Sequence, residues 1–181
     1  MKNLKKLNRH FLKLAAAVVL AIPLVATAAG TPKSPHTIQA AGTWIDCNIA
    51  PHVRTAGPNT FVTVGIKEIF TGTMEGTYEG FEHIVVRSDG TGTFRGSGIF
   101  TGTVGGRSGT AIFSYQGAFG AEGAEANWSF VGLTESLASV SGLGTFDAFA
   151  IDEGDVDGLF CAECDGGVYA GGYTGEFKIG R

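Results

Sequence analysis

The last proline of the sequence is Pro58, and the long segment after it alternates apolar and polar residues at every second position. Proline cannot donate a ladder hydrogen bond, so a segment without it can form long, uninterrupted strands. An alternation of period two that is rich in Thr, Val, Ile and Phe predicts β-strands with one apolar face, whereas helical periodicity is missing from most of this segment. The sequence therefore predicts an all-β protein.

Glycine-containing segments between the alternating runs predict tight hairpin turns. The expected loops are three residues long at Met74-Glu75-Gly76 and Ser88-Asp89-Gly90, and two residues long at Gly105-Gly106 and Gly120-Ala121. With these turns the apolar residues of five successive strands all fall on one face, and a slip by one residue would invert every face. In the resulting register Glu68 lies opposite Glu82, and Tyr78 lies opposite Phe100.

Consecutive strands joined by short turns predict a closed or nearly closed antiparallel up-and-down β-barrel, here of about eight strands. Further strands are expected at Gly142–Ala150 and Val168–Ile179, and a short helical turn within Thr134–Ser141. Glycine supplies 29 of the 181 residues. Many glycines face aromatic residues on the apolar side, where they leave room for rings and for curvature. A membrane-spanning barrel fits less well, because lipid would then meet the face that carries Thr, Ser, Lys and Arg.

The first 28 residues have the layout of a secretory signal peptide. Basic residues without an acid precede an apolar run from Leu14 to Val25, and Ala26-Thr27-Ala28 is a small-residue cleavage pattern. The apolar run is too short for a membrane span, which needs about 20 residues. We therefore expect an exported, periplasmic or secreted protein, with residues 29–41 as a flexible lead-in and residues 42–181 as one barrel domain.

Removal of the signal segment takes away five of the 13 basic residues and leaves all 17 acidic ones, which gives a net charge of −9. Such a charge repels the phosphates of nucleic acids and anionic lipid headgroups. We expect a neutral, cationic or apolar partner, no nucleic acid, and no membrane binding once the signal is removed. The oligomeric state stays open.

Three segments carry a resemblance to a known family. They are FTGTMEGTYEGFEHIVVRSDGTGTF at 70–94, IFTGTVGGRSGTAIFSYQGAF at 99–119 and ANWSF at 126–130, and the stretch 101–110 is the most specific part. Over residues 42–149 the chain resembles a bacterial family of domains of unknown function with an allene-oxide-cyclase-like β-barrel fold. The resemblance implies a barrel related in shape to plant allene oxide cyclases and dirigent proteins, which position a reactive apolar substrate in a cavity. It transfers no activity and no catalytic motif to particular residues, and the segments 152–167 and 168–179 depart from the family.

Glu68 and Glu82 are the candidate catalytic residues. The expected register sets both carboxyls on the apolar face, directly across two strands, where repulsion in a low dielectric raises at least one pKa. Such a pair can serve as general acid and base, or orient a polar group of an apolar ligand. Two alternatives remain open: the carboxyls lie in water at the barrel mouth, or Arg95 or Lys67 pairs with one of them.

Five aromatic residues share the expected inner face: Tyr78, Phe94, Phe113, Tyr115 and Trp128. They are the predicted ligand-binding residues of a cavity with aromatic walls and phenol hydroxyls. The same rings can instead fill the interior, since an eight-stranded barrel is only just wide enough to be packed solid. The sequence leaves these two arrangements open.

The acidic C-terminal segment 152–167 holds two of the three cysteines. In an oxidising compartment Cys161 and Cys164 are expected to form a local disulfide, because the helix that a redox motif needs is missing. Glu153–Gly158 resembles part of a calcium loop, although a solvated acidic loop fits its residues better, and calcium binding stays open. Neither a cofactor nor a metal site is predicted.

Together these features favour the binding of a small apolar molecule inside the barrel. One alternative is a cyclase or isomerase of the allene-oxide-cyclase type that uses Glu68 and Glu82 together with the tyrosines. Another is a structural or interaction protein with a packed core. The sequence does not decide whether the chain is an enzyme, nor which ligand it binds.

Overall fold

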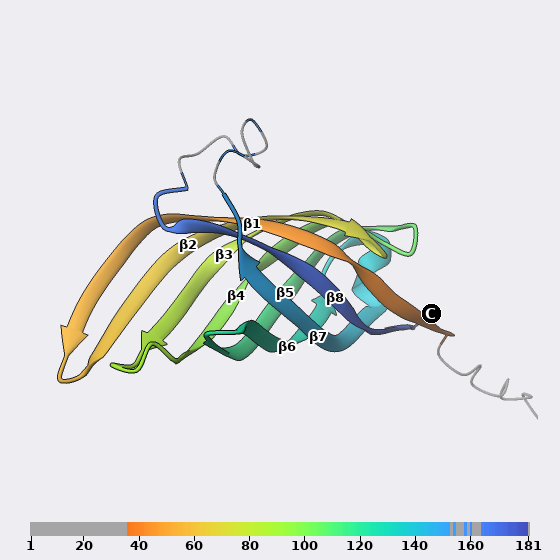
Figure 1. Cartoon of the computed structure of the whole chain (residues 1–181). Coiled ribbons are helices and arrows are strands. Elements are labelled where there is room, and N and C mark those ends of the chain that lie inside the picture. Colours follow the sequence, from red (N-terminus) through yellow and green to blue (C-terminus); the bar gives the residue numbers. More distant parts are fainter. Residues whose placement is uncertain (1–35, 153, 155–157, 159, 161–163, 181) are drawn as a thin grey trace, which may run out of the picture. The chain divides into compact units, whose positions relative to one another are not determined.

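The computed structural model describes residues 36–152, 154, 158, 160 and 164–180, and its strands form one closed β-barrel (Figure 1). Each strand is antiparallel to the next, and β8 pairs with β1 to close the barrel. The elements are β1 (His36–Ala56), β2 (Asn59–Gly72), β3 (Met74–Val86), β4 (Gly92–Val104), β5 (Arg107–Gly120), β6 (Gly123–Gly132), the 3-10 helix η1 (Glu135–Ser139), β7 (Val140–Ala150) and β8 (Gly167–Ile179). The predicted all-β, up-and-down barrel of eight strands is confirmed.

The register of the middle strands agrees with the predicted faces. Tyr78 pairs with Phe100 across β3 and β4, as expected. Gly105 and Gly106 form the turn between β4 and β5 with φ angles of 56° and 80°, the left-handed conformation that a two-residue hairpin turn requires. The turn between β5 and β6 lies at 121–122 instead of Gly120-Ala121, a shift of one residue that keeps the same side chains inside.

The predicted pairing of Glu68 with Glu82 is wrong. Glu68 lies opposite Tyr78, and Glu82 lies four residues further along β3. The chain reverses at Thr73 and not in the predicted three-residue loop, because Met74 is fully buried and belongs to β3. Burying this apolar side chain shortens the turn. The observed register of β3 against β2 differs from the predicted one by four residues, and because this number is even both carboxyls stay on the inner face.

Strand β1 is the element that the sequence analysis missed. It starts at His36, so the last part of the predicted lead-in is strand, and it pairs with β2 on one side and β8 on the other. Its register with β2 shifts between Ile49 and His52, where Ala50 has a φ of 50° and Pro51 cannot donate a ladder hydrogen bond. Beyond this irregularity the strand is exposed, and its hairpin with β2 extends past the neighbouring strands (Figure 1).

The two ends of the barrel differ. The helix η1 and the start of β1 lie at one end, called here the helix end, whereas the turns at 57–58, 87–91 and 121–122 lie at the other, called the open end. Following paired residues once around the barrel from Asn48 leads to Ile38, ten residues away on the same strand. Eight staggered strands enclose an interior just wide enough to be filled by side chains or to hold one small ligand.

Toward the helix end the interior is filled by aromatic rings. Phe70 packs edge to face on Phe113 with ring centroids 5.4 Å apart, and Phe130 packs on Phe177 at 5.2 Å. Leu137 of η1 is fully buried and covers this end. We call this ring-filled part of the interior the packed core; it comprises Phe70, Met74, Phe100, Val104, Phe113, Trp128, Phe130, Leu137, Tyr173 and Phe177.

No helix in the described part of the chain is long and apolar enough to cross a membrane.

The polar atoms of the packed core have partners. The Tyr173 hydroxyl accepts a hydrogen bond from the Met74 backbone N–H at 2.7 Å and lies 3.1 Å from the Thr71 carbonyl, to which it donates. The indole Nε1 of Trp128 donates to the Thr145 carbonyl at 3.1 Å. Burial of these groups therefore leaves no polar atom of either side chain unpaired.

Candidate functional site

Three carboxyl side chains face the barrel interior next to the packed core. Asp46 of β1 and Glu68 of β2 are direct register partners, and they are only 7% and 5% exposed. Glu82 of β3 is partly buried and lies nearer the open end, four residues beyond Tyr78, which is the other partner of Glu68. We call Asp46, Glu68 and Glu82 the acidic cluster.

Glycines beside the tyrosines determine where the phenol hydroxyls lie. Gly96 is the register partner of both Glu82 and Tyr115, and a Cβ on Gly96 would overlap the Tyr115 ring. The ring of Tyr115 therefore lies across Gly96, and its hydroxyl is near the Glu82 carboxyl and the Tyr78 hydroxyl. The ring of Tyr78 lies over Gly80 of its own strand, so its hydroxyl points along β3 toward Glu82.

Burial raises the pKa of all three carboxyls. The pKa values of Asp46 and Glu68 are well above the usual range, mainly because of burial and further because of repulsion by neighbouring carboxylates. Burial raises the pKa of Glu82 to about 7, against a smaller lowering by the neighbouring Tyr115 hydroxyl. Burial also raises the phenol pKa values, and nearby carboxylates add to this effect, in Tyr78, Tyr115 and Tyr169. Glu82 therefore changes its protonation state near neutral pH.

Three buried polar atoms around the acidic cluster have no hydrogen-bond partner: Trp44 Nε1, Asn48 Oδ1 and the Tyr78 hydroxyl. Their side chains are 5%, 4% and 0% exposed. Asp46, in contrast, accepts a hydrogen bond from the Tyr169 backbone N–H at 2.9 Å. A buried polar atom without a partner is costly. We call these three residues, the acidic cluster, Tyr115 and Tyr169 together the polar cluster.

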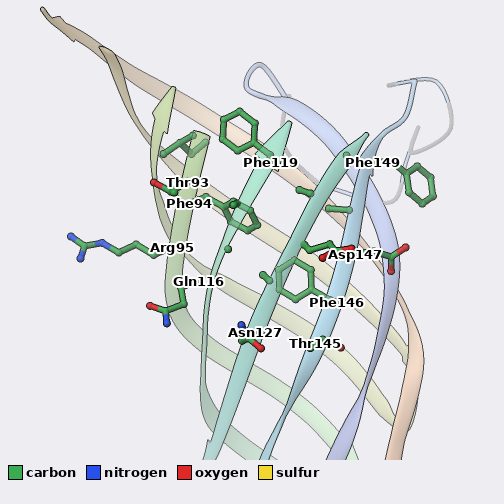
Figure 2. A pocket seen from close by; sticks show the side chains of 18 of the residues that line it. Thr93, Phe94, Arg95, Gln116, Phe119, Asn127, Thr145, Phe146, Asp147 and Phe149 are labelled. Atoms are coloured by element: carbon green, nitrogen blue, oxygen red, sulfur yellow. The ribbon is translucent and has the colours of Figure 1, made fainter. Parts of the chain in front are cut away.

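Neither Lys nor Arg faces the acidic cluster within the described strands. The inward-facing positions of β1 to β8 hold one such residue, Arg107, at the helix end. Lys67 lies on the outer wall with its Nζ 3.8 Å from Glu79, and Arg95 extends away from the barrel (Figure 2). Neither base considered from the sequence pairs with the candidate glutamates. Among the described residues no three His, Cys, Asp or Glu side chains are grouped so that they could hold a metal ion.

A hollow lies at the open end of the barrel, and polar side chains such as Arg95, Gln116 and Asn127 are among its lining residues (Figure 2). The side chains that line its inner wall are apolar: Val62, Ile84, Phe94, Phe119, Ala124, Phe146 and Ala148. Phe146 connects the hollow to the polar cluster, because its ring centroid is 5.4 Å from that of Tyr115 and 5.3 Å from that of Trp44. The site is thus an apolar entrance with carboxyl and phenol groups behind it.

The five aromatic residues predicted to bind a ligand all face inward, but they have different surroundings. Phe113 packs on Trp128 at 5.9 Å and on Tyr78 at 5.7 Å, so these three rings belong to continuous ring packing. Phe94 lines the hollow, and Tyr115 packs on its ring at 6.1 Å. Of the five predicted residues, Phe94 lines the hollow at the open end and the other four do not.

The disulfide joins Cys47 to Cys164 across 117 residues, and the predicted pairing of Cys161 with Cys164 is wrong. Strand β8 begins opposite Asn48 of β1, so the segment just before β8 reaches Cys47 on the outer wall. Asp165 Oδ1 fixes this segment by accepting a hydrogen bond from the Ala50 N–H at 2.6 Å. Cys161 and most of the calcium-loop-like segment 153–158 lie outside the described residues.

Sequence reasoning missed the residues that β1 and β8 add to the site. Asp46, Trp44 and Asn48 come from β1, and Tyr169 comes from β8. The signal was present in β1, because every second residue from position 38 to position 48 faces inward. Extending the period-two pattern toward the N-terminus would have placed Asp46 on the inner face.

Residues 47–157 match the family described as "Protein of unknown function (DUF3224)". A solved structure with a similar fold is the crystal structure of a protein with unknown function from this family in Shewanella oneidensis MR-1. It is 14% identical, has a TM-score of 0.59, and aligns over 81% of this chain and 99% of its own. No curated protein is similar enough in sequence to count as a relative. The resemblance to a bacterial family of unknown function is thus confirmed, and the chain belongs to the DUF3224 family.

Proposed function

We propose that the protein binds a small, largely apolar molecule at the open end of the barrel. One observation carries the proposal: the hollow has an apolar inner wall, and the wall residue Phe146 packs on Trp44, whose buried indole N–H has no partner within the described part of the protein. Apolar walls with a few polar groups are the usual composition of small-molecule sites. A ligand with one hydrogen-bonding group buries its apolar body against Phe94, Phe119 and Phe146 and supplies the missing partner.

Titration with N-phenyl-1-naphthylamine, a neutral apolar dye, tests this proposal. We expect saturable binding with a rise in dye fluorescence. Ala124→Trp fills the hollow from the inner face of β6 and should weaken binding at least about tenfold. Val131→Trp is the matched control, because Val131 is exposed on the outer wall of the same strand and is not among the residues that line the hollow. Absence of saturable binding, or equal loss in both variants, contradicts the proposal and favours a structural role for the barrel.

Acid–base catalysis of the cyclase or isomerase type is a second candidate, supported by Glu82. Its pKa of about 7 and the adjacent Tyr115 hydroxyl suit a group that gives and takes a proton near neutral pH. If a bound molecule is converted, Glu82→Gln should abolish turnover while dye binding persists. Turnover that survives this change excludes Glu82 as the acid or base.

Export of the chain is part of the same proposal. The signal-like residues 1–28 support it, and the Cys47–Cys164 disulfide is compatible with an oxidising compartment. Expression of the full chain in a bacterium should yield a periplasmic or secreted protein whose mass corresponds to a start at Ala29. A cytoplasmic protein of full-length mass contradicts export.

A further inference from the structure

We infer that the ligand is an organic cation, an apolar body that carries a protonated amine, and that the amine is held by the acidic cluster. This inference rests on the proposed binding function and specifies its ligand. The acidic cluster gathers three carboxyls on adjacent strands β1, β2 and β3. Within the described strands, Lys and Arg are absent from the inner positions facing them. A buried carboxylate needs a compensating charge or a proton.

Unpartnered buried acceptors point to a ligand that donates hydrogen bonds. Asn48 Oδ1 flanks Asp46 on the inner face of β1 and has no donor, and its side chain is 4% exposed. The Tyr78 hydroxyl, fully buried and without a partner, lies along β3 on the path to Glu82. A primary ammonium offers three N–H donors and no acceptor, so its donors suit oxygens of the carboxylate, amide and phenol types.

Aromatic faces near the carboxyls suit the same ligand. Phe146, at the inner wall of the hollow, packs against both Trp44 and Tyr115. Rings of these types attract a cation through their negative faces. Glu82 is the most exposed of the three carboxyls, so it is the first that an entering amine meets. The apolar wall of the hollow therefore suits the body of such a ligand, and the carboxyls and aromatic rings behind it suit the amine.

Two naphthalene compounds of equal size test the ligand class by displacing the dye. They are 2-(1-naphthyl)ethylamine, which is protonated at neutral pH, and 2-(1-naphthyl)ethanol, which is neutral. At about pH 8 we expect the amine to bind at least about tenfold more tightly than the alcohol. Glu82→Gln should remove most of this difference, so that amine and alcohol bind to the variant with similar affinity. Glu79→Gln, an exposed acid on the outer face of the same strand, is the control and should change nothing.

Proton release gives a readout that needs no variant. The titratable groups around the proposed amine site are Asp46, Glu68, Glu82, Tyr78, Tyr115 and Tyr169. An ammonium stabilises the carboxylate form, so calorimetry near pH 6 in two buffers of different ionisation enthalpy should show protons released with the amine but not with the alcohol. Amine affinity should fall on acidification to about pH 5, where the carboxyls are protonated.

The outcomes separate the two proposals. Dye binding with equal affinity for amine and alcohol overturns the cationic ligand and leaves the binding function in place. An amine advantage that survives Glu82→Gln, or that comes without proton release, overturns the assignment to the acidic cluster. Failure of the dye and both naphthalene compounds to bind overturns the proposed function itself.

Discussion

The packed core and the polar cluster both contain tyrosine and tryptophan, but the polar atoms of these side chains differ in their hydrogen bonding. In the packed core the Tyr173 hydroxyl and the Trp128 indole N–H are both hydrogen-bonded. In the polar cluster the Tyr78 hydroxyl and the Trp44 indole N–H are both buried without partners. Since an unsatisfied buried group costs stability, the comparison separates a region organised for stability from one that retains unsatisfied groups, as functional sites do.

Removal of one aromatic ring from the packed core and one from the hollow should show the largest difference in the free energy of unfolding. Phe130→Ala removes a ring that is 1% exposed and should lower the free energy of unfolding by about 4 kcal/mol. Phe119→Ala removes a partly buried ring at the hollow and should cost about 1 kcal/mol. Urea denaturation measures both. Equal losses would mean that the open end is packed as firmly as the helix end.

Removal of the disulfide should weaken the wall beside the polar cluster. Cys47→Ser combined with Cys164→Ser should lower the free energy of unfolding by about 3 kcal/mol, because the bond closes a long loop. Hydrogen exchange should accelerate around Asp46 and Tyr169 before it does in the packed core. Cys161→Ser keeps the observed bond and serves as the control. A loss of stability in that variant equal to the double change contradicts the pairing.

Titration of Glu82 should make stability depend on pH. Its pKa in the folded protein is about 7, above the ordinary value of 4.5, so the folded state binds the proton more tightly than the unfolded chain. The stability that protonation of Glu82 contributes is therefore fully present below about pH 4.5. It is lost as the pH rises through about 7, and the loss is about 2 kcal/mol for a partly buried group. Glu82→Gln should abolish this contribution and be more stable than the parent at pH 8. A pH profile unchanged by Glu82→Gln contradicts the burial of this carboxyl.

Removal of one hydroxyl from each region is the finest test of the comparison. Tyr173→Phe breaks hydrogen bonds to Met74 and Thr71 and should cost about 1 kcal/mol. Tyr78→Phe removes a hydroxyl that has no partner and should cost nothing or stabilise slightly. Thermal denaturation of the two variants, measured side by side, decides whether the difference in hydrogen bonding has an energetic counterpart.

Alternation of period two made the inner faces predictable, because it depends on local sequence alone. Glu68, Glu82, Tyr78 and Tyr115 were all placed inside, and all four face inward. The neighbours of Glu68 were not predicted, because the first register depends on whether Met74 enters the strand or the loop. A buried methionine and a loop methionine look the same in the sequence, so tertiary packing decided the matter.

Contacts that depend on closure of the barrel were beyond local reasoning. Asp46 joins the acidic cluster because β1 pairs with β2, and Tyr169 joins the site because β8 returns to β1. The partner of Cys164 depends on the same return. Spacing favoured Cys161 as the nearest thiol, whereas the strand pairing brings Cys47 to within 5.0 Å between Cα atoms.

Closure also places the two ends of the folded chain side by side, since His36 pairs with Ile179. A chain that lacks β8 leaves β1 and β7 with unpaired edges, which invite intermolecular pairing. The Cys47–Cys164 bond bridges β1 and the segment that leads into β8, so its native geometry requires that these two strands have met. Mass spectrometry of trapped thiols during refolding therefore counts, chain by chain, how many barrels have closed.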